Sequence, residues 1–209
     1  MLSSTKEKMI AGAADLISRQ GVAATSLRDV VHHTGTPRGS LAHHFPGGKQ
    51  QMLEEAVAYA DHAVAGPLAD LLHTHGPVEG LLAFIAWWQH VLEVSDFEAG
   101  CPVLAVAIEQ GSVMDTLGDE EVGARERLRL LVHGAFSSWQ GIFAGSLVKA
   151  GVEDERAKSL AALVVASVEG TVAMCRAARS REPLDSVTRE LHAILKLTLQ
   201  QVPTSEKNE

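Results

Sequence analysis

The chain has 209 residues, of which 46% are hydrophobic and only 4% aromatic, and its formal net charge is −8. This length allows one or two domains, and a chain of this size buries roughly 70% of its unfolded surface. The apolar residues are mainly Ala, Leu and Val without a period-two pattern, which argues against a β-protein and predicts an all-α fold. The apolar runs fall short of the ~18–20 residues of a membrane span, and the N-terminal segment does not fit a signal peptide.

The charge is unevenly distributed along the chain. Residues 1–50 carry six basic and three acidic side chains, a net charge of +3, whereas the remainder carries 12 basic and 23 acidic side chains, a net charge of −11. A basic end on an acidic body predicts two functions in one chain, with nucleic-acid binding at the basic end. Cys101 and Cys175 lack metal-ligand spacing, so we expect free thiols in a reducing, cytoplasmic compartment.

The first helix is indicated by Met9, Ala13 and Ile17, which recur at helical spacing. This pattern predicts a helix over residues 4–19 that ends at Gly21, where a left-handed residue would stop it. A second, short helix follows, and either Thr25 or Ser26 is expected to cap it, because a hydroxyl oxygen can accept from the free N–H groups of the first turn.

The stretch GTPRGSLAHHFPGG predicts the end of the second helix and the whole of a third. Gly35 can adopt positive φ and ends the second helix, Thr36 is expected to cap the third, and Pro37 is expected at its first position. Leu41 and Phe45, four residues apart, form its buried face. Two short helices joined by a tight glycine-containing turn predict a helix-turn-helix motif.

The outward face of the third helix suits the major groove of DNA. Arg38 can form a fork of hydrogen bonds to guanine, Gly39 lets the backbone approach closely, and Ser40 can donate or accept. Residues at helix starts and flanks are expected to lie near phosphates. The residues expected to contact DNA are Thr25, Thr36, Arg38, Gly39, Ser40, Ala42, His43, His44 and Lys49.

The segment TSLRDVVHHTGTPRGSLAHHFPGGKQQMLEEAV resembles the DNA-binding domain of the TetR family of bacterial transcriptional regulators. Its PRGSL and HHFPGGK portions are most similar to the LmrA/YxaF-like (QacR-like) branch, and GCPVLAVAIE, residues 100–109, resembles that branch's C-terminal domain. The resemblance implies a homodimer of all-helical subunits that represses transcription from operator DNA until a small molecule releases it. The family usually has an aromatic residue where this chain has Ala42, so the operator preference does not transfer from relatives.

Three segments follow from the motif, the composition and the resemblance together. We expect a helix-turn-helix DNA-binding domain over residues 1–50, a helical ligand-binding and dimerisation domain over 51–202, and a disordered tail over 203–209. Gly66 and Pro67 are expected to interrupt the long helix that begins at Lys49, because proline inside a helix removes a hydrogen bond. This interruption is either a fixed kink or a hinge that transmits ligand binding.

Aromatic residues of the C-terminal segment suggest a cavity for an apolar or aromatic ligand, with ordinary core packing as the alternative. The residues expected to line it are Phe84, Trp87, Trp88, Val91, Met114, Phe136, Trp139, Gln140, Phe143 and Met174. Two C-terminal helices are apolar around much of their circumference and are expected to form a four-helix dimer interface. The residues expected there are Leu163, Val164, Ala166, Gly170, Leu184, Val187, Leu191 and Ile194.

The sequence leaves other functions open. The chain contains ten histidines but neither the His pair with a nearby acid of a zinc hydrolase nor a nucleotide-binding loop, so we expect no metal, cofactor or catalytic residue. A helical metal-dependent hydrolytic enzyme is the alternative of a different class, and a plain ligand carrier or structural dimer is another. A transcriptional activator of the same fold is equally compatible with DNA binding.

Overall fold

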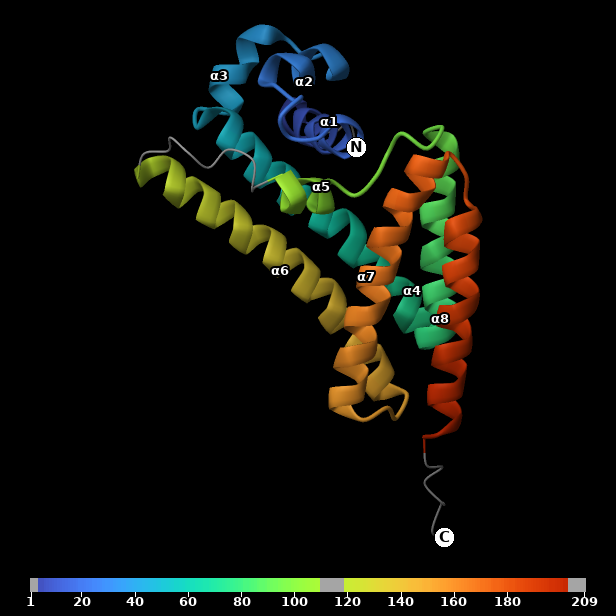
Figure 1. The fold of residues 1–209 in the computed structure, drawn as a ribbon. Helices are drawn as coiled ribbons and strands as arrows, with labels where there is room; N and C mark the ends of the chain where they lie inside the picture. Colours follow the sequence, from blue (N-terminus) through green and yellow to red (C-terminus); the bar gives the residue numbers. More distant parts are fainter. Residues whose placement is uncertain (1–3, 110–118, 203–209) are drawn as a thin grey trace. The chain divides into compact units, whose positions relative to one another are not determined.

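The computed structural model describes residues 4–109 and 119–202 and confirms the all-α prediction, because the described residues contain helices and no strand (Figure 1). The elements, in chain order, are α1 (Thr5–Gln20), α2 (Leu27–Thr34), the short 3₁₀ helix η1 (Arg38–Ser40), α3 (Leu41–His44), α4 (Gly48–Val94), α5 (Pro102–Glu109), α6 (Asp119–Lys149), α7 (Asp154–Ala178) and α8 (Glu182–Gln200). The expected tail, residues 203–209, lies outside the described residues.

Contacts divide the chain into two compact units. The first unit comprises residues 1–63 and 98–136, and the second comprises 64–97 and 137–209. The predicted DNA-contacting residues all belong to the first unit, which also contains α5 and the first half of α6. Helices α7 and α8 belong to the second unit and pack against each other (Figure 1).

Helix α1 begins and ends as its sequence predicts. The Ser4 hydroxyl accepts from the Glu7 backbone N–H at 3.2 Å, and the Glu7 carboxylate accepts from the Ser4 N–H at 2.7 Å, which forms a capping box. Gly21 ends the helix with φ of 83°. Met9, Ala13 and Ile17 are fully buried, which confirms the predicted apolar face.

The core of the second unit consists of apolar side chains from α4, α6, α7 and α8. Its members include Leu81, Ile85, Phe143, Leu147, Leu160, Val172, Leu184 and Leu195, all with less than 3% of their surface exposed. The Gln89 amide donates to Asp185 at 2.7 Å and joins α4 to α8. The length and composition of α7 would allow it to cross a membrane, and 44% of its apolar window is buried inside the structure. One such helix is weak evidence for a membrane span.

The predicted interruption at Gly66 and Pro67 is wrong. Helix α4 continues through both residues, and its non-helical backbone lies at Gly76, with φ of 76° and ψ of 179°, just before Pro77. Packing explains this choice, because a Cβ atom built on Gly80 would lie 2.8 Å from the Leu71 carbonyl oxygen. The chain folds back on itself closely at Gly76, whereas a Cβ on Gly66 meets no atom within 4 Å.

This difference gives a matched pair of substitutions in one helix. We expect Gly80→Ala to lower the free energy of unfolding by about 1–2 kcal/mol, because the added methyl group collides with backbone that cannot move aside easily. Gly66→Ala should instead raise it by up to about 1 kcal/mol, because alanine is the better helix former and the site is open. Urea unfolding of both variants checks the pair, and equal effects would contradict the packing explanation.

Candidate nucleic-acid interface

Ser26, rather than Thr25, caps α2. Its hydroxyl accepts from the Asp29 backbone N–H at 3.2 Å, and the Asp29 carboxylate accepts from the Ser26 N–H at 2.9 Å. Hydrogen bonds from the hydroxyl and backbone N–H of Ser26 hold the pKa of Asp29 below its usual range. The carboxylate therefore stays charged at the positive end of the α2 dipole, where it stabilises the helix start.

The expected phosphate contact of Thr25 is corrected by the structure. Its side chain is fully buried, and its hydroxyl donates to the Gly21 carbonyl oxygen at 2.7 Å. Thr25 therefore stabilises the turn between α1 and α2 from inside. A Thr or Ser hydroxyl at this place can stabilise a turn, cap a helix or contact a phosphate. The sequence alone could not distinguish these three roles for the adjacent residues Thr25 and Ser26.

The turn after α2 follows the prediction at Gly35 and departs from it at Thr36. Gly35 adopts the left-handed conformation, with φ of 63° and ψ of 22°, and its N–H bonds the Val31 carbonyl. Thr36 does not cap the third helix, because its hydroxyl pairs with that of Thr34 at 2.8 Å and the next helical residue is Arg38. Pro37 has extended backbone and precedes the helix instead of occupying its first position.

The third helix is a short 3₁₀ turn followed by one α-turn, and it presents its polar face outward. Arg38, Gly39, Ala42 and His43 are exposed, and no ion pair or hydrogen bond within the described chain engages the Arg38 guanidinium. Phe45 is 3% exposed and anchors the end of the segment, which confirms its predicted burial. Leu41 is only half-buried, so the inward face is narrower than expected.

The remaining predicted DNA contacts, Ser40, His44 and Lys49, are all half-buried. The Ser40 hydroxyl donates to the Pro37 carbonyl oxygen at 2.6 Å and so stabilises the 3₁₀ turn. The His44 ring lies edge-to-face against His43 with centroids 5.0 Å apart, and its carbonyl accepts from Gln51 at 3.3 Å. Their DNA contacts stay predictions.

Gly39 provides a test of close backbone approach. Its φ is not in the left-handed region, and a Cβ built there meets no atom within 4 Å, so the fold does not require glycine at this position. We expect Gly39→Ala to leave the free energy of unfolding unchanged or slightly higher, because alanine favours helix. The same methyl group should weaken operator binding on the order of tenfold, measured by fluorescence anisotropy. Unchanged operator affinity would show that DNA does not approach this backbone.

The turn between α1 and α2 is held by two side chains from distant parts of the first unit. The Lys49 ammonium donates to the Val22 carbonyl oxygen at 2.7 Å. The Glu109 carboxylate, at the end of α5, accepts from the backbone N–H groups of Val22 at 3.0 Å and Ala23 at 2.9 Å. We call these two hydrogen bonds the Glu109 bridge. Lys49 therefore has a structural partner in addition to its predicted DNA contact.

Sequence reasoning missed Glu109, because the bridge joins residues more than eighty positions apart. A carboxylate at the end of an apolar helix carries no local mark of such a partner. The glycine at position 21 is the local feature of the sequence that reflects the Glu109 bridge, because a Cβ atom on Gly21 would lie 2.1 Å from the nearer Glu109 oxygen.

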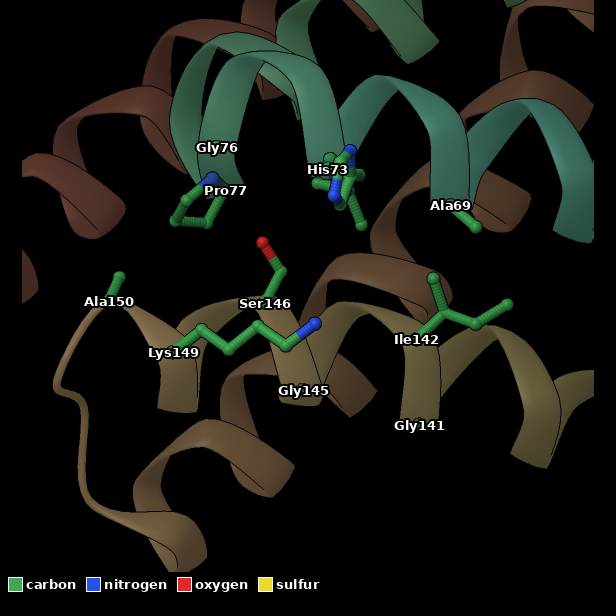
Figure 2. A pocket seen from close by; sticks show the side chains of 11 residues that line it. Ala69, His73, Gly76, Pro77, Gly141, Ile142, Gly145, Ser146, Lys149 and Ala150 are labelled. Atoms are coloured by element: carbon green, nitrogen blue, oxygen red, sulfur yellow. The ribbon is translucent and has the colours of Figure 1, made fainter.

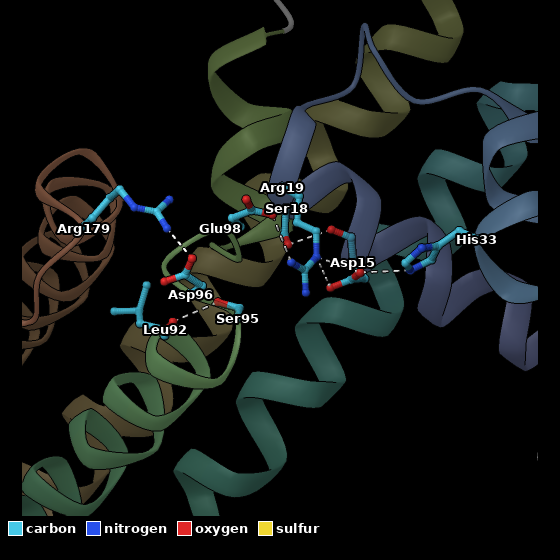
Figure 3. A network of polar contacts seen from close by, with 9 residues as sticks. All are labelled: Asp15, Ser18, Arg19, His33, Leu92, Ser95, Asp96, Glu98 and Arg179. Carbon is cyan, nitrogen blue, oxygen red and sulfur yellow. Dashed lines mark hydrogen bonds and ion pairs between the residues drawn. The ribbon is translucent and has the colours of Figure 1, made fainter.

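A second polar network in the first unit fixes α1 to α2. Asp15 accepts from the Arg19 guanidinium at 2.9 Å, and His33 lies 3.0 Å from the same carboxylate (Figure 3). Arg19 also pairs with Glu98 at 3.7 Å. His33 is therefore occupied within the first unit, and the described residues contain no cluster of His, Cys, Asp or Glu fit to hold a metal ion.

The predicted ligand-binding residues are brought together only in part. Phe84, Trp139 and Phe143 line a cavity of about 20 Å³ within the second unit, where the buried carboxylate of Glu169 also lies. Trp87 stacks on Phe84 with centroids 5.6 Å apart, and Trp88 lies edge-to-face against Trp87 at 5.0 Å. The cavity holds about one water molecule in this conformation.

Four further described residues of the predicted ligand site do not line this cavity. Met174 is 57% exposed on α7, which corrects its assignment to the cavity. Phe136 falls in the first unit, and Met114 lies outside the described residues. Val91 and Gln140 are half-buried and do not line the cavity.

The predicted dimer residues divide into exposed and buried sets. Leu163 is 44% exposed, Ala166 and Gly170 are exposed, and Val187 and Ile194 are half-buried. The structure corrects the other three, because burial within the subunit leaves them no surface for a partner. These residues are Val164, Leu184 and Leu191, each at most 4% exposed.

Comparison with known proteins identifies the chain. Residues 9–56 match the family model for bacterial regulatory proteins of the tetR family, and residues 77–190 match the model for the C-terminal domain of LmrA/YxaF-like transcriptional regulators. The chain belongs to the TetR family. The residues that made the resemblance, the helix-turn-helix segment and the segment over residues 100–109, lie inside these two matches.

Similar proteins cover nearly the whole chain. An HTH-type transcriptional regulator of Mycobacterium tuberculosis is 36% identical over 93% of this chain and 95% of its own length. The regulator LmrA of Bacillus subtilis is 28% identical over 92% of this chain and 97% of its own length. A TetR regulatory protein from Rhodobacter sphaeroides has the same fold, with a TM-score of 0.77 and 20% identity over 91% of this chain and 98% of that protein.

The family match settles the broad function. TetR-family proteins are DNA-binding transcriptional regulators and not enzymes, so this chain regulates transcription through its helix-turn-helix. Members bind operator DNA and small-molecule effectors and function as dimers. Arg38, Gly39, Ala42 and His43 are exposed on η1 and α3, and their contacts with DNA stay predictions.

Proposed function

We propose that this TetR-family chain is a cytoplasmic homodimeric repressor that binds a palindromic operator and is released by a small hydrophobic or aromatic molecule. Residues 1–50 serve as the DNA-binding domain and residues 51–202 as the ligand-binding and dimerisation domain. The observation that carries the proposal is the exposed face of η1 and α3, where Arg38 has no protein partner in the described chain and Gly39 has no structural requirement.

Dimerisation through α7 and α8 is supported by apolar surface that the subunit leaves uncovered. Leu163, Met174 and Leu197 are between 44% and 58% exposed on these helices. Ala166 and Gly170, also exposed, allow close approach of a second backbone. Two reading segments related by two-fold symmetry require inverted half-sites about one helical turn apart.

Footprinting on the DNA upstream of the chain's own gene tests the proposal. We expect a protected inverted repeat, bound by one dimer, and a dimer by light scattering at micromolar concentration. A monomer, or the absence of any protected sequence, would contradict it. A reporter gene controlled by the protected site distinguishes repression from activation, because deletion of the regulator raises expression in the first case and lowers it in the second.

Ligand response is supported by the aromatic side chains around the small cavity of the second unit. The Nε1 atom of buried Trp88 has no hydrogen-bond partner among the described residues, and an unmet buried donor costs about 1–3 kcal/mol. Trp88 does not line the cavity but contacts Trp87, which stacks on Phe84 of its wall. A ligand with an apolar body and an acceptor group would satisfy this donor once the cavity enlarges toward Trp88. Hydrophobic compounds that bind there should quench tryptophan fluorescence and raise the melting temperature. A screen that leaves both signals unchanged would count against the ligand response.

A further inference from the structure

A second cavity of the second unit is far larger than the aromatic one. It lies where α4 bends at Gly76 and Pro77, and α6 forms its other wall (Figure 2). Its volume is about 590 Å³, within the range of about 300–1,000 Å³ that small-molecule sites occupy. We call it the Gly76 groove. None of the predicted ligand-binding residues lines it.

The walls of the groove combine apolar and basic groups. Leu72, Pro77 and Ile142 supply apolar surface, and the first two are buried. His73 reaches in from α4 and Ser146 points from α6 into the space between the helices, while the Lys149 side chain runs along α6 toward Gly145 (Figure 2). No acidic side chain is among the described residues that line the groove, although the chain carries a net charge of −8.

The width of the groove comes from glycine. Gly141 and Gly145 line it one helical turn apart, and a Cβ built on either meets no atom within 4 Å. Glycine in a helix interior costs up to about 1 kcal/mol relative to alanine, and packing within the described chain does not require it at these two positions. The glycines keep open a space that larger side chains would fill.

From this surface we propose that the Gly76 groove binds an anionic amphipathic molecule, such as a medium-chain carboxylate. The carboxylate pairs with the Lys149 ammonium and accepts from Ser146 or His73, because a charge-assisted hydrogen bond is the strongest contact that these groups offer. The alkyl chain lies against Leu72 and Pro77 of α4 and Ile142 of α6. The lining residues from Gly141 to Ala150 extend about 13 Å, which gives the chain room. The site rests on the groove alone and is independent of the proposed release from DNA.

Calorimetric titration of the full-length protein with decanoate tests the proposal. We expect decanoate binding to saturate. The neutral decanol should bind at least about tenfold more weakly than decanoate, because the alcohol lacks the charge that Lys149 recognises. Decyltrimethylammonium should not compete. Equal binding of decanoate and decanol, or the absence of decanoate binding, would overturn the proposal. The titration contains no DNA, so its failure and failure of the proposed regulator function are separate outcomes.

Variants locate the binding site. Lys149→Ala should weaken decanoate binding about tenfold while leaving decanol binding unchanged. Gly145→Leu should abolish decanoate binding by filling the groove, with the melting temperature maintained, because leucine is a good helix former. Gly134→Leu is the matched control: this α6 glycine also has open space at its Cβ but does not line the groove. Retained binding in Gly145→Leu, or equal loss in Gly134→Leu, would place decanoate elsewhere and overturn the proposal.

Discussion

Arg38→Ala is expected to weaken operator binding by about 2–6 kcal/mol in total, because a dimer places one Arg38 in each half-site and a bidentate contact to guanine contributes about 1–3 kcal/mol of discrimination. Affinity for random DNA should fall much less, since phosphate contacts carry no sequence information. Stability should not change, because the side chain is exposed and has no partner within the described chain. Anisotropy titrations with operator and scrambled duplexes measure both affinities.

Arg28→Ala provides the control for charge. Arg28 is an exposed arginine on α2, in the same basic segment, but it lies outside the exposed face of η1 and α3. Loss of a phosphate contact there would lower affinity for both duplexes equally and reduce the salt dependence by about one phosphate per subunit. If Arg38→Ala behaves like Arg28→Ala, with equal losses on operator and scrambled DNA, Arg38 does not read bases.

The sequence predicted those parts of the fold that depend on neighbouring residues. Helices α1 and α2 begin at serines whose hydroxyls meet N–H groups three residues later, and Gly35 ends α2 through its own left-handed backbone. These interactions lie within a few residues of each other, so a local pattern is enough to find them. The all-helical class followed from composition for the same reason.

The predictions that failed depend on contacts between distant residues. Gly66–Pro67 and Gly76–Pro77 look alike in sequence, and only the close packing of Gly80 against Leu71 selects the second as the bend. Thr25 is a residue type that often caps helices, yet its side chain is buried and its hydroxyl donates to the Gly21 carbonyl oxygen. The apolar stripes of α7 and α8 could not reveal which side faces the subunit core, so buried Val164 and Leu184 were grouped with exposed Leu163.

The candidate site shows the same division. The sequence located the exposed residues of η1 and α3 that we predict to read bases, because a helix-turn-helix carries its signal in a short segment. The support of that segment was not visible, since the Glu109 bridge comes from a helix near the middle of the chain. Its residues also connect the two family matches, because Val22 and Ala23 lie within residues 9–56 and Glu109 lies within residues 77–190.

Glu109→Gln is expected to lower the free energy of unfolding by about 2–3 kcal/mol. A carboxylate accepts from both N–H groups with charged oxygens, whereas an amide offers one acceptor and turns an N–H₂ group toward the other donor. Hydrogen bonds to charged groups contribute about 1.5–3 kcal/mol each, and partial exposure of this pair lowers their sum. Amide exchange at Val22 and Ala23 should accelerate together, because both N–H groups lose the same partner.

The turn that the Glu109 bridge holds leads directly into α2, so operator affinity should fall together with stability in Glu109→Gln. This loss would be indirect, because the negative charge of Glu109 makes no favourable contact with DNA phosphates. Glu98→Gln is the matched control. Glu98 is another carboxylate of the first unit, it forms an ion pair with Arg19, and its side chain is 62% exposed. Its loss should cost less than about 1 kcal/mol and leave exchange at Val22 and Ala23 unchanged. If Glu109→Gln matches Glu98→Gln in unfolding, amide exchange and operator affinity, the Glu109 bridge does not position the helix-turn-helix.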